Sequence, residues 1–109
     1  MLDTYRYKVD FSEVKQYGDI HKILRRDLEF PDYYGGNLDA LWDCLTDQLL
    51  SGITYIEIVS FDKILKEYSN EWQGILEVFK ETKHAYGDKY SNNFFVTLVC
   101  DDGTREEIE

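Results

Sequence analysis

Three aspartates stand four residues apart in the middle of the chain, at Asp39, Asp43 and Asp47. Apolar residues recur between them at helical spacing, which predicts one helix with the aspartates in a row along it. Like charges at this spacing destabilise an isolated helix by about 0.2–0.5 kcal/mol per pair, and aspartate is a mediocre helix former. Such a row indicates a site for a cationic partner, with an ordinary solvated acidic face as the alternative. The pattern predicts that the aspartates are exposed and that the apolar side is buried through Leu38, Leu41 and Leu45.

Paired carboxylates could also serve an enzyme. Asp39 and Asp43, one helical turn apart, could meet the carboxyl separation of a retaining glycosidase, but a domain this small has little room for the necessary cleft. The aspartates could hold a divalent cation weakly, yet the wrapping loop of a tight calcium site is absent. Neither His21 nor His84 has a serine or cysteine nucleophile at a recognisable motif. The sequence therefore predicts no enzyme, no metal and no cofactor.

Large aromatic side chains accompany the carboxylates. Trp42 lies in the same helical segment, about 40° from the centre of its apolar face on an ideal helical wheel. Tyr33 and Tyr34 precede the helix on a glycine bend, where one ring is expected to pack inward while the other covers the surface. Rigid aromatics beside charges are typical of binding surfaces, and core packing is the alternative for each ring.

Hydrophobic periodicity predicts the order strand, two helices, strand, two helices, strand. The predicted strands cover residues 4–9, 53–59 and 92–100, and the predicted helices cover residues 19–29, 38–50, 61–69 and 71–84. Asp19 could cap the first helix and Asn37 the second. Apolar strands separated by helices indicate a parallel sheet with right-handed crossovers. We therefore expect one α/β domain over residues 1–109, with a three-stranded sheet.

The acidic tail "DDGTREEIE" has two possible structures. Asp102-Gly103 is a favourable hairpin turn, so Thr104 to Ile108 could return as an edge strand. A frayed terminus is the other possibility and the one that we expect.

The net charge of −10 bounds the class of partner. Such a field repels nucleic acid and anionic membranes and attracts basic partners, most strongly at low salt. Cys44 and Cys100 form no CxxC pair, the N-terminus is no signal peptide, and no apolar run approaches the roughly 20 residues of a membrane helix. We expect a cytoplasmic protein with reduced thiols that binds neither nucleic acid nor membranes.

The segment "FPDYYGGNLDALWDCL", residues 30–45, resembles the signature of the barstar family, the intracellular inhibitors of the secreted ribonuclease barnase. The pattern Pro-x-Tyr-Tyr-Gly-x-Asn-Leu-Asp-Ala-Leu-Trp-Asp-Cys-Leu matches with its spacing intact, and "ILEVFKE" resembles the last helix of the family. The similarity extends over nearly the whole chain. It implies a barstar-like fold, in which three parallel strands are flanked by about four helices and the signature helix blocks a ribonuclease active site.

Residue by residue, the resemblance implies a partner-binding surface on one loop, one helix and the last helix. Its members are Tyr33, Gly35, Asn37, Asp39, Trp42, Asp43, Thr46 and Glu81. Asp43 would be the chief anchor, at the phosphate position among the cationic side chains of the nuclease. Carboxylates in this place mimic RNA phosphates without offering a cleavable bond. The resemblance thus implies a monomeric, antitoxin-like inhibitor whose partner is a basic secreted ribonuclease.

Three positions depart from the type member of the family. Gly36 replaces an acid, Asp47 replaces a glycine and Gln48 replaces a tryptophan. These changes do not alter the expected fold, but they leave the target open. The alternative is an acidic interaction module of the same fold that binds a different basic protein or toxin.

Overall fold

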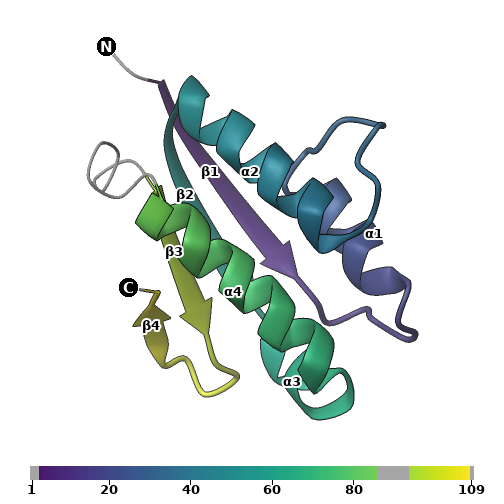
Figure 1. Ribbon diagram of the computed structural model, residues 1–109. Coiled ribbons are helices and arrows are strands. Elements are labelled where there is room, and N and C mark those ends of the chain that lie inside the picture. The colour runs from purple at the N-terminus through teal and green to yellow at the C-terminus, as the bar shows by residue number, and fades with distance from the viewer. Residues whose placement is uncertain (1–2, 86–93, 109) are drawn as a thin grey trace.

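The computed structural model describes residues 3–85 and 94–108, which form four strands and four helices (Figure 1). The strands are β1 (Asp3–Asp10), β2 (Gly52–Val59), β3 (Phe94–Val99) and β4 (Arg105–Glu107). The helices are α1 (Asp19–Asp27), α2 (Leu38–Ser51), α3 (Phe61–Glu67) and α4 (Ser69–Ala85). This order confirms the predicted α/β class and the predicted succession of elements up to β3.

The strands form a single sheet in the order β1-β2-β3-β4. The first three strands run parallel, with Tyr7 opposite Ile56 and Ile56 opposite Val96. This direction follows from the helices between successive strands, because a parallel pair needs a long crossover connection. Helices α2 and α4 lie across the same face of the sheet (Figure 1). The sheet therefore packs against one side of α2, and the opposite side of this helix faces solvent, where a partner can bind.

One hydrophobic core lies between the sheet and the helices. In β2 the residues alternate between buried and half-buried, and so do those of β3, because successive side chains of a strand point to opposite faces. The largest fully buried side chains come from both layers and include Phe11, Ile20, Leu24, Leu41, Leu45, Ile56, Ile58, Ile75, Phe79 and Phe94. Burial of each such side chain contributes roughly 1.5–3 kcal/mol to folding.

The other face of the sheet carries a ladder of aromatic and cationic side chains. Tyr55 and Phe95, partners in the β2–β3 register, stack with their ring centroids 4.9 Å apart. The Arg6 guanidinium lies 4.4 Å from the centroid of the Tyr55 ring, and Lys83 Nζ lies 5.2 Å from that of Phe95. Arg6, Tyr55 and Phe95 make cross-strand contacts that favour the observed register, whereas Lys83 reaches the Phe95 ring from α4 (Ser69–Ala85).

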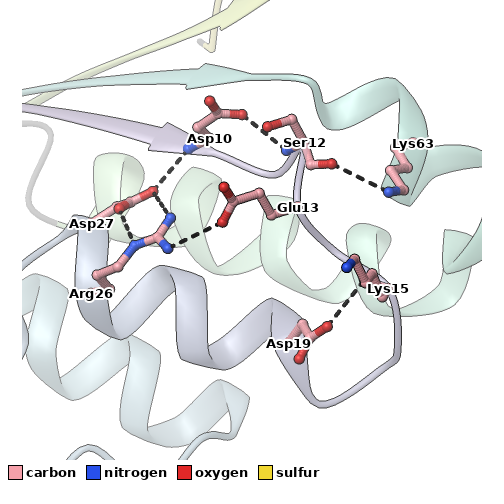
Figure 2. Close-up of polar contacts among 8 residues, drawn as sticks. All are labelled: Asp10, Ser12, Glu13, Lys15, Asp19, Arg26, Asp27 and Lys63. Carbon is pink, nitrogen blue, oxygen red and sulfur yellow. Dashed lines mark hydrogen bonds and ion pairs between the residues drawn. The ribbon is translucent and has the colours of Figure 1, made fainter.

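The connection from β1 to α1 is held by bonds between side chains and backbone (Figure 2). The Asp27 carboxylate accepts a hydrogen bond from the Asp10 backbone N–H at 3.0 Å and a second one from Arg26 Nε at 2.8 Å. Lys63 Nζ donates to the backbone carbonyl of Ser12 at 3.3 Å, which ties the loop to α3. Helix α1 is thereby anchored beside β1.

Asp19 does not cap α1 as the sequence predicted. Gly18 occupies the N-cap position, and Asp19 lies in the first turn of the helix. Its carboxylate accepts the backbone N–H groups of Lys15 at 3.0 Å and Gln16 at 3.2 Å, and these bonds lower its pKa. The prediction was wrong because the loop before the helix places the backbone N–H groups of Lys15 and Gln16 beside the Asp19 carboxylate. The carboxylate accepts from these groups and makes no capping bond to the first turn of α1.

The C-terminal tail folds back as an edge strand, so the expectation of a frayed terminus and a three-stranded sheet was wrong. Strand β4 pairs antiparallel with β3 through a turn in which Gly103 has a positive φ of 89°. The Ile108 side chain is only 4% exposed, and its N–H donates to the Val96 carbonyl at 2.8 Å. The turn residues and this one apolar anchor outweigh the acidic composition of the segment.

Replacing Ile108 by alanine should therefore lower the free energy of unfolding by about 2–4 kcal/mol, because it leaves a cavity beneath β4. Urea denaturation followed by circular dichroism measures this loss. The exposed Asp101 of the same tail offers a matched control, and Asp101→Ala should change stability by less than about 0.5 kcal/mol. Equal stability of Ile108→Ala and Asp101→Ala would show that the tail does not contribute to the core.

Candidate protein-binding site

Helix α2 divides its residues between the core and the surface. Leu41 and Leu45 are fully buried, while Asp39 and Asp43 are exposed, as the sequence predicted. Leu38 was also expected to be buried, but it is half-buried and reaches a surface groove instead. The helix begins at Asn37, whose Oδ1 accepts the Ala40 N–H at 2.8 Å, which confirms the predicted N-cap.

Two exposed carboxylates of α2, Asp39 and Asp43, take no part in an ion pair among the described residues. Their negative field is felt nearby: the pKa of the Cys44 thiol is raised first by burial and then by the charges of Asp47 and Asp43. Exposed carboxylates without partners are available to cations from outside.

An open groove of about 400 Å³ lies between α2 and α4. Its lining residues come from both helices and are Leu38, Asp39, Trp42, Gly74, Glu77, Val78 and Glu81. The helices approach closely because of Gly74, since a Cβ there would lie 2.7 Å from Leu38 Cδ1. The groove thus combines apolar walls with three carboxylates, an arrangement that suits the stem and charged head of an arginine or lysine. We call it the acidic groove.

The loop between α1 and α2 presents one tyrosine and buries the other. Tyr33 is 76% exposed, whereas Tyr34 is 8% exposed and packs against Phe30 with ring centroids 5.0 Å apart. This confirms the expected division of the pair. Gly36 has a φ of 70°, a left-handed conformation that favours glycine. We call residues 33–37 the contact loop.

A chain of hydrogen bonds beneath the contact loop joins it to two helices. The Tyr34 hydroxyl lies 2.6 Å from His21 Nδ1, and His21 Nε2 lies 2.7 Å from Glu71 Oε1. The Tyr17 hydroxyl donates to the other oxygen of Glu71 at 2.7 Å. The pKa of Tyr34 is raised, chiefly because burial disfavours its phenolate. The buried tyrosine therefore stays a neutral hydroxyl that is hydrogen-bonded to α1.

Most of the residues implied by the family resemblance come together around α2. Tyr33, Gly35, Asn37, Asp39 and Asp43 are all exposed. Trp42 and Glu81 meet Asp39 at the acidic groove, and α4 lies beside α2 as required. Thr46 is half-buried and its hydroxyl donates to the Asp43 carbonyl at 2.9 Å, so its polar atom already has a partner. Gln48 lies in a helical segment whose side chains are outside the described part.

Several residues of the site were missed by the sequence analysis. Glu77 and Val78 line the acidic groove, and Glu77 lies one helical turn before Glu81. The sequence signal that could have identified Glu77 is this four-residue spacing, which places both acids on the same face of the predicted helix. His21 and Glu71, which support the contact loop, are far apart in sequence and gave no signal of their meeting.

The described residues contain no group of three or more histidine, cysteine, aspartate or glutamate side chains placed to hold a metal ion. Among the helices that the structure describes, none is both long and apolar enough to cross a membrane.

The fold and the site together define a small α/β protein that offers carboxylates, an exposed tyrosine and a half-buried tryptophan on one surface. Residues 5–99 match the family described as "Barstar (barnase inhibitor)", and the chain belongs to this family. It is also 40% identical over 76 residues to a Bacillus subtilis (strain 168) protein named "Putative ribonuclease inhibitor YrdF". That alignment covers 65% of this chain and 77% of the relative. Membership of the family supports a ribonuclease-inhibitor role rather than an enzymatic one.

The N-cap can be tested without a partner. Asn37→Ala removes the side-chain acceptor of the Ala40 N–H and should lower the free energy of unfolding by about 0.5–2 kcal/mol. Asn37→Asp keeps an acceptor at the same place and should retain most of the stability. Urea denaturation of both variants decides this, and a loss confined to Asn37→Asp would contradict the assignment.

Proposed function

We propose that the protein inhibits a barnase-type ribonuclease by covering its basic active site with α2, whose carboxylates occupy the places of RNA phosphates. The observation that carries the proposal is that Asp39 and Asp43 are exposed on α2 beside the acidic groove, without an ion pair among the described residues, in a member of the barstar family. A ribonuclease binds a polyanion and so presents cations in its active site. The proposal includes a basic secreted nuclease, captured in the cytoplasm by a monomeric inhibitor.

The charge distribution supports fast capture. The chain carries a net charge of −10, and exposed carboxylates of α2 and α4 lie on the surface that the nuclease would meet. Long-range attraction between opposite charges raises association rates by roughly 10–10³-fold, and salt reduces the effect. Rapid capture matters for an inhibitor that has to act before the nuclease meets cellular RNA.

The chemistry of the interface supports slow release. Asp43 is exposed near the middle of α2. The contact loop directly precedes this helix, and the acidic groove lies between α2 and α4. A carboxylate enclosed among arginine and lysine side chains forms short, charge-assisted hydrogen bonds. A rim of aromatic and apolar side chains, including Tyr33 and Trp42, keeps water from these bonds.

Asp43→Ala should weaken binding to a barnase-class ribonuclease by at least about a hundredfold, because it leaves the enclosed cations of the nuclease without their counter-charge. Surface plasmon resonance and inhibition of RNA cleavage both measure the loss. Asp101→Ala removes an equal charge from the exposed tail and is the matched control, which should bind nearly as well as wild type. Equal affinity of the two variants would refute the assigned role of Asp43.

The association rate should fall steeply as salt is raised from about 0.05 to 0.5 M, because screening shortens the reach of the carboxylates. Stopped-flow fluorescence of the tryptophans follows the encounter. A rate that does not change with salt would contradict electrostatic steering. If the protein binds no ribonuclease of this class but captures another basic protein, the specific target in the proposal is wrong and the module remains an acidic binder.

A further inference from the structure

The hydrogen-bonded chain below the contact loop has a defined direction when the imidazole is neutral. The Glu71 carboxylate can only accept, so the proton on His21 lies on Nε2 and is donated to Glu71. A neutral imidazole then offers the lone pair of Nδ1, and the Tyr34 hydroxyl donates to it. Glu71 therefore selects the tautomer that accepts from the loop, in the way that a carboxylate orients an imidazole elsewhere in proteins.

The loop also rests directly on His21. A Cβ built on Gly36 would lie 3.7 Å from His21 Cβ, so the backbone at the tip of the loop packs over this side chain. His21 and Glu71 are largely enclosed, with side chains 12% and 13% exposed. Hydrogen bonds in such an enclosed place are shielded from competition by water. Of the contact-loop residues, Tyr33, Gly35 and Asn37 are the ones implied to meet the partner, and they flank the two that touch His21.

We propose that His21, oriented by Glu71, is a positioning residue that holds the contact loop in its binding arrangement through the Tyr34 hydroxyl. The inference rests on the proposed function for its consequence in binding, although its effect on the loop can be measured without any partner. It assigns a role in recognition to three residues, none of which faces the partner.

Two substitutions of His21 distinguish positioning of the contact loop through Tyr34 from a purely structural link between α1 and α4. In His21→Asn the side-chain oxygen can replace Nδ1 as the acceptor for Tyr34, but the shorter side chain can no longer donate a hydrogen bond to Glu71. In His21→Gln the amide nitrogen can replace Nε2 as the donor to Glu71, while the acceptor for Tyr34 is lost. Tyr34→Phe removes the hydroxyl and keeps the ring against Phe30.

The first measurement is amide hydrogen exchange by NMR at Tyr34, whose N–H donates to the Pro31 carbonyl, and at Ala40, which is bonded to Asn37. Exchange should rise roughly fivefold in His21→Gln and Tyr34→Phe, as expected for the loss of one hydrogen bond, and stay within about twofold of wild type in His21→Asn. The double variant His21→Gln with Tyr34→Phe should add nothing further. Faster exchange in His21→Asn with normal exchange in His21→Gln would overturn the proposal in favour of a structural bridge.

The second measurement is the rate of dissociation from a barnase-class ribonuclease. Dissociation should speed up roughly fivefold in His21→Gln and stay within about twofold of wild type in His21→Asn. Equal dissociation rates for wild type and His21→Gln would overturn the link to binding. If wild type binds no such nuclease, the proposed function fails, and the exchange experiment still decides whether His21 positions the loop.

Discussion

Helix α2 has to bury one side in the core while its other side keeps Asp39 and Asp43 exposed and outside the ion pairs of the described residues. Leu41 and Leu45 of this helix are fully buried. Their packing stabilises the helix and outweighs the repulsion between its aspartates. Because the sheet and α4 supply the stabilisation, the exposed carboxylates need not be neutralised by the chain's own lysines and arginines. Every other feature of the site depends on this division of the helix.

The elements around α2 set what the carboxylates can recognise. Gly74 lets α4 approach until Leu38, Trp42 and Glu81 share one groove with Asp39. At the N-terminal end of α2, the contact loop is held by the contact between Tyr34 and His21. An interface formed from preordered parts loses less conformational entropy on binding, which favours a long-lived complex. The supports are buried or enclosed, whereas the groups implied to meet the partner are exposed, except for the half-buried Trp42 and Thr46.

The two faces of the sheet differ in character. The helix-covered face is apolar, whereas the other face places Arg6, Tyr55 and Phe95 in one row of contacts. Lys83 of α4 also lies over the Phe95 ring and forms an ion pair with Glu107 of β4. Arg6 and Lys83 therefore contact rings and β4 rather than Asp39 or Asp43, and these two carboxylates keep their field for a basic partner.

Much of the fold followed from local pattern. The β-branched, aromatic and apolar residues of segments 53–59 and 92–100 and the helical spacing of residues 38–50 identified these elements, because each pattern reflects burial against the core. Asn37 as a cap and Asp39 and Asp43 as exposed charges were equally local. The folding of the tail, the close approach at Gly74 and the chain from Tyr34 through His21 to Glu71 were decided only by tertiary structure. Local patterns show which way a side chain points, but the identity of its distant neighbour depends on how the elements pack.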